Sequence, residues 1–177
     1  DNYAGISDSG VIRENRVYQN EQVGIRVVYD GMVERNVVYS NAVGILASSG
    51  AATLRNNLVY ANSTQGILIQ SARPGFLLLN NTVDQTNGEA VRIESSSQGV
   101  NLRNNVISVG SGAALSVASD SQVGFQSDYN LFYITGSGAV ASWQGVTRAT
   151  LADWQYAAFL DQNSLARNPL FVDRDGA

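Results

Sequence analysis

An internal repeat of 21 to 25 residues is the feature that most limits what this chain can fold into. The clearest copies are Asn15-Arg-Val-Tyr18, Asn36-Val-Val-Tyr39 and Asn57-Leu-Val-Tyr60. Weaker copies follow at Asn81, Asn105 and Asn130. The column of asparagines is therefore Asn15, Asn36, Asn57, Asn81, Asn105 and Asn130, with successive spacings of 21, 21, 24, 24 and 25 residues. A Gly-Ile motif, which becomes Ala-Val and Ala-Leu in the last two copies, keeps step at residues 5, 24, 44, 66, 90 and 114. Two motifs in step through six copies indicate a solenoid, in which each repeat packs on the next.

The pattern inside each copy is typical of a β-strand. In Gly24-Ile-Arg-Val-Val28, Ile25 and Val27 share one face, while Arg26 and Val28 share the other. These segments are too short for helices, and clusters of Asn, Ser and Gly separate them. The repeat therefore predicts an all-β chain of stacked coils, each pairing with the next.

The asparagine column has a structural interpretation. Side-chain amides stacked at one sharp bend lie about 4.8 Å apart, the spacing of paired strands, and can hydrogen-bond to one another. Such bonds would satisfy polar groups where the strand ladder is interrupted. A second partial column, Asn20, Asn41 and Asn62, predicts another bend.

These Gly-Ile and Asn-x-Val/Ile motifs resemble the right-handed parallel β-helix repeats of the pectin-lyase-like superfamily, specifically its carbohydrate-binding and sugar-hydrolase type. The resemblance runs from about residue 5 to residue 133. It implies a right-handed parallel β-helix of about six coils, an extracellular or cell-envelope location, and polysaccharide as partner. The tail, from 128 to 173, resembles the closing region of many secreted members. We expect the chain to be a fragment of a longer protein.

The ends of a solenoid expose unpaired strand edges and need caps. We expect coils over residues 1–149 and, in the same domain, a capping helix and extended return over 150–177. Thr150 and Asp153 resemble a capping box, and Trp154 and Phe159 are predicted to fix a helix over 150–160 against the last coil. Residues 164–173 would return as extended chain. The N-terminus shows no such device, so we expect an earlier coil or cap.

The composition excludes several kinds of site. The chain has no Cys and no His, and all 11 basic residues are Arg. Zinc or copper sites built on Cys or His, Ser-His-Asp and Cys-His nucleophile systems and a lysine base are therefore excluded. The net charge of −4 argues against nucleic acid and against an anionic membrane surface. No apolar run approaches the roughly 20 residues that span a bilayer, so membrane insertion is not expected.

No cofactor is predicted, and calcium is the only metal with candidate ligands. The segments Asp161-Gln-Asn163-Ser164 and Asp173-Arg-Asp175-Gly176 offer oxygen atoms, but neither completes an EF-hand loop. Acidic residues in turns usually stabilise the turn.

The repeat alignment also predicts outward columns. Arg13, Glu34 and Arg55 form a ladder of alternating charge, and Glu14–Arg35 and Arg103–Asp128 are predicted pairs. Tyr18, Tyr39 and Tyr60 should stack on one outer face, either as a saccharide platform or as a structural aromatic ladder.

The face after the glycines is where catalytic relatives often carry a substrate groove. It presents Arg26, Arg92 and Glu94, which we predict as substrate-binding residues. A hydrolase needs two or three carboxylates here, but only Glu94 is present, with Glu89 nearby, so no catalytic residue is assigned. Val28, Leu46 and Leu68 are predicted to form an exposed apolar strip on this face, a type of surface that often makes contacts.

Three functions remain open from the sequence. The first is a polysaccharide-binding or scaffold segment of an extracellular or envelope protein, without a complete active site. The second is a truncated polysaccharide lyase, epimerase or glycoside hydrolase. The third is a self-associating structural module.

Overall fold

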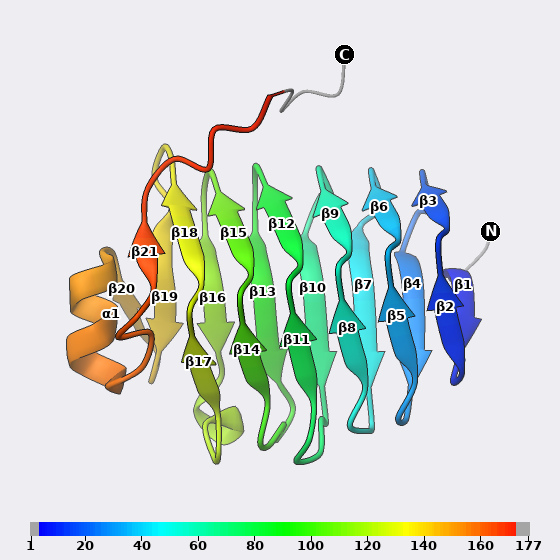
Figure 1. The fold of residues 1–177 in the computed structure, drawn as a ribbon, viewed down its shortest axis with the longest axis horizontal. Helices are drawn as coiled ribbons and strands as arrows, with labels where there is room; N and C mark the ends of the chain where they lie inside the picture. Colours follow the sequence, from blue (N-terminus) through cyan, green and yellow to red (C-terminus); the bar gives the residue numbers. More distant parts are fainter. Residues whose placement is uncertain (1–3, 173–177) are drawn as a thin grey trace.

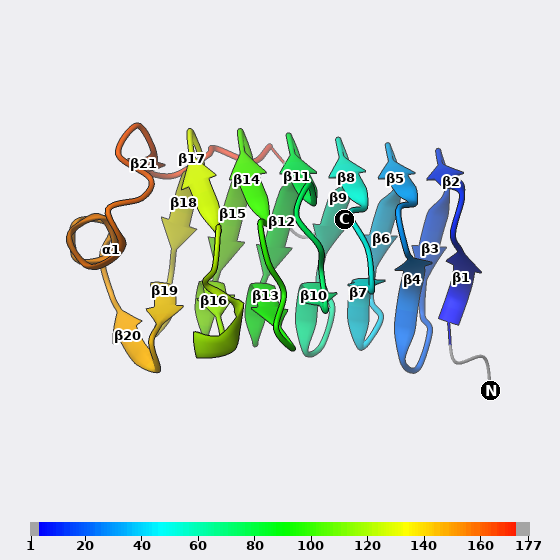
Figure 2. The same ribbon diagram turned by 90° about the horizontal axis from the view of Figure 1, so that it is seen from below.

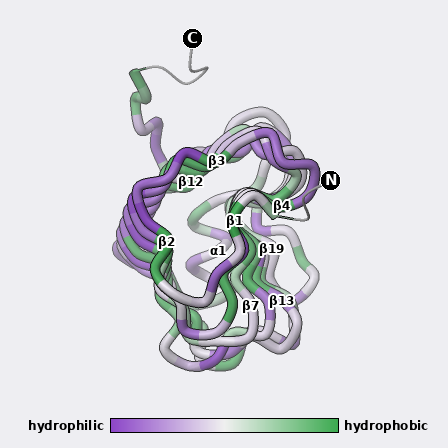
Figure 3. Tube along the Cα trace, turned by 90° about the vertical axis from the view of Figure 1, so that its right-hand side faces the viewer, coloured by the Kyte–Doolittle hydropathy of each residue, from purple (hydrophilic) through white to green (hydrophobic). Residues whose placement is uncertain are grey.

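The chain winds into a parallel β-helix, and a computed structural model describes its residues 4–172. Six coils each add one strand to each of three parallel sheets, which we call A, B and C (Figures 1 and 2). Viewed along the axis, the coils superimpose closely (Figure 3). The predicted β-helix of about six coils is confirmed.

Every coil runs through the sheets in the order A, B, C. Sheet A contains β1 (Ala4–Asp8), β4 (Val23–Val28), β7 (Val43–Ser48), β10 (Gln65–Gln70), β13 (Glu89–Glu94), β16 (Ala113–Val117), β19 (Ala139–Trp143) and the antiparallel β20 (Val146–Arg148). Sheet B contains β2 (Val11–Arg13), β5 (Met32–Glu34), β8 (Thr53–Arg55), β11 (Leu77–Leu79), β14 (Asn101–Arg103) and β17 (Gln126–Asp128). Sheet C contains β3 (Arg16–Tyr18), β6 (Val37–Tyr39), β9 (Leu58–Tyr60), β12 (Thr82–Gln85), β15 (Val106–Val109), β18 (Leu131–Ile134) and β21 (Leu165–Ala166).

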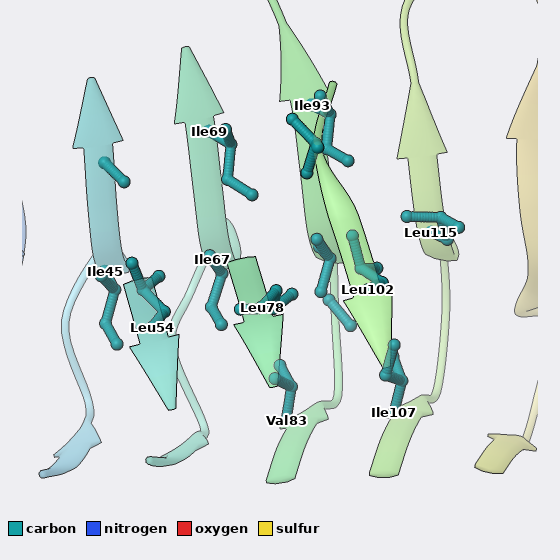
Figure 4. Close-up of a cluster of buried hydrophobic side chains, with 14 of the residues drawn as sticks. Ile45, Leu54, Ile67, Ile69, Leu78, Val83, Ile93, Leu102, Ile107 and Leu115 are labelled. Carbon is teal, nitrogen blue, oxygen red and sulfur yellow. The ribbon is translucent and has the colours of Figure 1, made fainter. Parts of the chain in front are cut away.

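The core is a set of apolar columns inside the coils. Alternate residues of a strand face inward, so most strands contribute one to three apolar side chains. In the third coil these are Ile45 and Ala47 from β7, Leu54 from β8 and Val59 from β9, all fully buried. The same positions repeat in the neighbouring coils (Figure 4). The period-2 pattern read from the sequence therefore decides which face of each strand is buried.

The six asparagines form a continuous hydrogen-bonded ladder at the bend between sheets B and C. The Asn57 Oδ1 accepts from the backbone N–H and the Nδ2 of Asn36, at 3.0 and 3.1 Å. Its Nδ2 donates to Asn81 Oδ1 at 3.0 Å and to the Val33 carbonyl at 2.9 Å. The same pattern repeats through Asn105 to Asn130. Each inner amide is thus buried with its donors and acceptors satisfied.

A second ladder lies at the bend between sheets C and A. Asn20, Asn41 and Asn62 bond to one another in the same way. The ladder continues in the next coil to Gln85, whose Oε1 accepts from the Asn62 N–H at 3.0 Å and whose Nε2 donates to the Asn62 carbonyl at 2.8 Å. Sequence reasoning missed Gln85 because the column changes residue type and the following loop lengthens in that coil.

The residue before each ladder asparagine adopts a left-handed backbone conformation. At the first bend these residues have φ between 55° and 59°, and they are Glu14, Arg35, Asn56, Asn80, Asn104 and Tyr129. Gln19, Ser40 and Ala61 hold the equivalent place at the second bend. Asparagine tolerates this region better than other residues with a β-carbon, which explains why it recurs at 56, 80 and 104.

Replacing Ala61 with glycine should therefore stabilise the protein. Ala61 is exposed and has φ of 50°, so its methyl group adds strain without adding buried contacts. The left-handed region costs about 1–2 kcal/mol for an ordinary residue, against about 0.5–1 kcal/mol of extra chain entropy for glycine. We expect a gain of up to about 1 kcal/mol in the free energy of unfolding, measured by urea denaturation. Ser63→Gly, at an exposed position without positive φ, is the control, and an equal gain there would contradict the argument.

A short helix closes the C-terminal end of the coils. Helix α1 (Leu151–Ala158) begins at the N-cap Thr150, and Thr150 and Asp153 make both bonds of the predicted capping box. Trp154 is fully buried and packs its ring edge-on against Trp143, with ring centroids 5.3 Å apart. Its Nε1 donates to Asp161 Oδ2 at 2.8 Å. The predicted capping helix and the role of Trp154 are confirmed.

The expectation that Phe159 also fixes the cap is wrong. Phe159 is the C-cap residue of α1, in the left-handed conformation, and 81% of it is exposed. The chain turns away from the coil at this point, so the ring points outward instead of inward. Of the expected extended return over residues 164–173, Leu165–Ala166 forms the strand β21, which pairs with β18. Residue 173 lies outside the described part of the chain.

Candidate functional site

The three tyrosines stack on one another along the outer face of sheet C. Tyr18 and Tyr39, and then Tyr39 and Tyr60, have ring centroids 5.0 Å apart, with planes 11° and 8° from parallel. The Arg16 guanidinium lies 5.5 Å from the Tyr39 ring centroid. Because the rings lie face to face, their facing flat surfaces are covered, and both faces of the central Tyr39 ring are taken by its neighbours. This geometry suits a structural aromatic ladder better than a platform on which sugar rings stack.

The predicted residues of sheet A lie in two separate places. Strand register pairs Arg26 with Leu46, Leu46 with Leu68, and Leu68 with Arg92. Arg26 and Arg92 are therefore three strand spacings apart, roughly 14 Å. The tyrosines lie on a different sheet. The structure thus brings together Arg92 and Glu94 but places Arg26 and the tyrosines elsewhere.

The expectation of an exposed apolar strip on sheet A is wrong. Leu46 is only 7% exposed, with Arg26 and Leu68 beside it in the same column. Val28 belongs to the next column, where it pairs with Ser48. Side chains one coil apart lie close enough to cover each other, so the central leucine is shielded.

Two of the four predicted charge pairs form as ion pairs among the described residues, and Arg13–Glu34 is not one of them. Arg35 binds Glu14 at 3.0 Å, and Arg55 binds Glu34 at 2.7 Å. The hydrogen bond from Arg55 lowers the pKa of the buried Glu34. The predicted Arg103–Asp128 pair is replaced by other contacts: the Arg103 guanidinium lies 4.9 Å from the Tyr129 ring centroid, and Asp128 accepts from Asn163.

Arg92 is held between two carboxylates on β13. Its Nη1 lies 2.8 Å from Glu89 Oε1, and its Nε lies 2.6 Å from Glu94 Oε2. Gln70 Nε2 donates to the other oxygen of Glu94 at 2.8 Å. We call Glu89, Arg92 and Glu94 the charge triad. Sequence reasoning expected Arg92 to neutralise a substrate carboxylate, but its charge is already matched by the protein.

The hydrogen bonds of the charge triad shift the ionisation of its members. Bonds from Gln70 and from Arg92 hold the pKa of Glu94 below its usual value, although partial burial opposes them. The bond to Glu94 raises the pKa of Arg92. Glu94 is therefore ionised at neutral pH and is poorly suited to act as a general acid, which requires a raised pKa.

An open groove of about 500 Å³ lies beside the charge triad. Its other walls come from β16, the β19–β20 hairpin and the short 3₁₀ segment Ser119–Ser121. The polar side chains facing it are Glu89, Arg92, Ser116, Ser119, Ser137, Ser142 and Thr147. Arg92, Ser116 and Ser142 are consecutive in one column, so the groove floor runs along the helix axis.

The groove combines an ion-paired charge with hydroxyl groups. Neither the Ser116 nor the Ser142 hydroxyl takes part in a hydrogen bond within residues 4–172, so both can serve a ligand. Ser116 follows from the repeat alignment, but Ser142 and Thr147 were missed. The repeat motifs end near residue 133, and the sequence contains no signal for the hairpin that brings these two side chains back to the groove.

The segment considered for calcium has a structural use. The Asp161 Oδ1 accepts from Asn130 Nδ2, and its Oδ2 accepts from Trp154. Asn163 bonds to Asp128, and the Ser164 hydroxyl accepts from the Asn130 N–H at 2.8 Å. Asp161 and Ser164 therefore close the asparagine ladder. The second candidate segment, 173–176, lies outside the described residues.

Comparison with solved structures supports the fold. The chain is similar to the A-module of the mannuronan C-5 epimerase AlgE6 from Azotobacter vinelandii, with a TM-score of 0.50 and 14% sequence identity. The match covers 93% of this chain and 53% of that module, so the chain spans about half of the module's length. At this level of identity the likeness shows the fold alone.

Sequence comparison places the chain in a family. A search of curated protein sequences found no significant match. The sequence profile of NosD, described as a periplasmic copper-binding protein, matches residues 1–145. The match covers well over half of the 177 residues and includes all six coils. This chain belongs to the NosD family.

Proposed function

We propose that the chain is a non-catalytic, polysaccharide-binding β-helix module of a periplasmic or extracellular protein. The observation that carries the proposal is the groove on sheet A, with its free Ser116 and Ser142 hydroxyls beside the charge triad. A groove that runs along the axis of a solenoid suits an extended ligand. The location is supported by the description of the family as periplasmic. Within residues 4–172, no helix is long and apolar enough to cross a membrane.

The electrostatics of the groove favour neutral sugars over uronic acids. Two carboxylates surround one guanidinium, so the charge triad carries a net charge of −1, and the whole chain carries −4. An incoming uronate would meet repulsion and no free cation at this position. Neutral sugars offer hydroxyl groups, which can both donate to the carboxylates and bond with the serine hydroxyls.

Catalysis receives less support from the same geometry. An acid–base hydrolase needs one protonated and one ionised carboxyl group across the scissile bond. Here Glu89 and Glu94 both bind Arg92, and the pKa of Glu94 is lowered. The truncated-enzyme alternative would therefore need residues beyond this chain.

The residues of this chain do not fit the copper named in the family description. Copper sites use His, Cys and Met side chains, whereas this chain has no His, no Cys and a single Met, Met32. Within residues 4–172, no three His, Cys, Asp or Glu side chains are placed to hold a metal ion. We therefore assign no copper-binding role to these side chains.

Removing the groove hydroxyls should weaken binding of neutral oligosaccharides. We expect the Ser116→Ala/Ser142→Ala variant to bind a neutral hexasaccharide, found by screening cello-, manno- and xylo-oligomers, roughly tenfold more weakly, which corresponds to about 1.4 kcal/mol. Isothermal titration calorimetry measures this change. Oligomannuronate of equal length should bind the unmodified protein at least as weakly.

Ser7→Ala provides a matched control. Ser7 is an exposed serine of the same column, paired with Arg26 at the opposite end of sheet A from the groove, and its loss should leave affinity unchanged. If the folded protein binds none of these glycans, polysaccharide binding fails and the scaffold function remains. Self-association stays a prediction for sedimentation to test.

A further inference from the structure

Phe159 occupies a position that is unfavourable for stability in two ways. It holds the left-handed C-cap conformation, with φ of 55° and ψ of 29°, where glycine is the usual residue. A bulky side chain in this region is a genuine outlier. Its ring is also 81% exposed, so burial does not compensate for the strain. Left-handed residues recur at the bends of this chain, Tyr129 among them, so a functional role for Phe159 depends on what its ring lines.

The ring forms one wall of a second open pocket, of about 340 Å³. The lining of this pocket comes from β14 and β17 in sheet B and from the loop that follows α1. Figure 1 shows these elements toward the end of the coils that carries α1. Its remaining lining is mostly polar and consists of Asn101, Arg103, Gln126, Ser127, Asp128, Leu160, Asp161 and Gln162. The groove of the charge triad lies on sheet A and shares none of these residues.

The pocket carries side-chain amides with bonding capacity to spare. Asn101 Nδ2 donates to Gln126 Oε1 at 3.2 Å, which leaves the Gln126 Nε2 available. The Asn101 Oδ1 is buried and has no hydrogen-bond partner within residues 4–172, so the groups left for a ligand are the amide of Gln126 and the second N–H of Asn101 Nδ2. Arg103 and Asp128 contribute opposite charges, and both are engaged by other groups, namely Tyr129 and Asn163. The carboxylate of Asp161, also in the lining, is engaged by Asn130 and Trp154. Every charged group of the pocket is thus bound within the protein, and the pocket offers directional bonding without a free cation for an acidic sugar.

We propose that this pocket is a second saccharide subsite, specific for a neutral sugar residue. An aromatic ring supplies a flat apolar surface for the C–H face of a pyranose. The amides of Asn101 and Gln126 supply both donors and acceptors for its hydroxyl groups. A volume of about 340 Å³ is at the small end of ligand sites and suits one or two sugar residues. The subsite goes beyond the function proposed for the groove, because it lies on another sheet and depends on other residues.

Phe159→Gly gives a test that separates binding from structure. If the ring is kept for a ligand, the variant should lose affinity and gain stability. We expect roughly tenfold weaker binding and a melting temperature higher by about 2–4 °C, because glycine relieves the backbone strain. A ring with a structural role would instead give a lower melting temperature, and that result overturns the proposal.

Tyr156→Ala is the matched control. Tyr156 belongs to the same helix and is 83% exposed, but it does not line the pocket. Its removal should change neither the affinity for the oligosaccharide nor the shifts that the oligosaccharide induces at Asn101 and Gln126. The probes are cello-, manno- and chito-hexaose, titrated into the ¹⁵N-labelled 177-residue protein.

The readout is the movement of individual NMR signals. We expect the side-chain amides of Asn101 and Gln126 to shift in the unmodified protein and to stay in place in Phe159→Gly. Shifts confined to Ser116, Ser142 and their neighbours would overturn the second subsite while supporting the groove. Shifts at Asn101 and Gln126 alone would support the second subsite and overturn binding in the groove. No shift at either place would overturn both binding sites.

Discussion

Asn57→Ala should be among the most destabilising single substitutions in this protein, lowering the free energy of unfolding by about 3–5 kcal/mol. The Asn57 amide is buried and completes bonds to both neighbouring coils. Its removal takes the side-chain partner from two buried groups, the Asn36 N–H and the Val33 carbonyl. The Asn81 Oδ1 loses one of its two bonds but still accepts from the backbone N–H of residue 57. Each buried group left unsatisfied costs about 1–3 kcal/mol, and water entering the space recovers part of this.

Asn15→Ala is the control for position within the ladder. Asn15 is the first member of the ladder and is only half-buried. Its Nδ2 donates to the Arg13 carbonyl and to Asn36 Oδ1. Truncating it strands fewer buried groups, so we expect a loss of about 1 kcal/mol. Urea denaturation followed by circular dichroism compares the two variants. Equal losses at the two positions would contradict the view that ladder bonds in the interior stabilise the coils.

Trp154→Ala should cost a similar amount, about 3–5 kcal/mol, and should act on the C-terminal coils. Trp154 is fully buried, packs against Trp143 and donates to Asp161. Losing it opens a cavity beneath α1 and removes a donor from a buried carboxylate that also accepts from Asn130. In a solenoid each repeat depends on its neighbours, so the damage should begin at this end.

Trp154→Phe separates the two contributions. It retains an aromatic ring in the core but cannot donate to Asp161, so we expect a loss of about 1–3 kcal/mol together with a smaller cavity cost. Hydrogen exchange measures where the effect falls: amides of β18 and β19 should lose protection before those of β7 and β10. Uniform loss of protection along the coils would show that the cap is not a local element.

The structure of the cap explains how the asparagine ladder ends. An inner asparagine uses the next asparagine as acceptor, and Asn130 has no successor. Asp161 and Ser164 take over, because they accept from Asn130 Nδ2 and from its N–H respectively. Trp154 in turn donates to the second oxygen of Asp161. The helix and the ladder thus form one hydrogen-bonded unit. Asn57→Ala and Trp154→Ala are both expected to be strongly destabilising because each removes bonds from this unit.

Much of the fold could be predicted from the sequence, because the interactions that define it repeat. Stacked coils place equivalent residues one strand spacing apart, so a column visible in the sequence is also a column in space. This is why Asn36, Asn57 and Asn81 indicate a ladder, and why Ile45 and Ile67 indicate a buried face. The capping box of Thr150 and Asp153 was equally visible, since its partners are three residues apart.

The candidate sites depend on contacts that do not repeat, and only the tertiary structure decides those. The repeat alignment relates Arg92 to Leu68 and Ser116 in the neighbouring coils. It does not reveal that Arg92 binds Glu89 and Glu94 on its own strand. Ser142 and Thr147 reach the groove through a hairpin that lies beyond the repeat. Phe159 has a large apolar side chain of the kind that usually lies in a core. It is nevertheless exposed, because a left-handed turn redirects the chain after α1. Periodic sequence thus determines which residues align along the axis, while the side-chain pairings and the irregular turns that build a binding surface follow from three-dimensional packing.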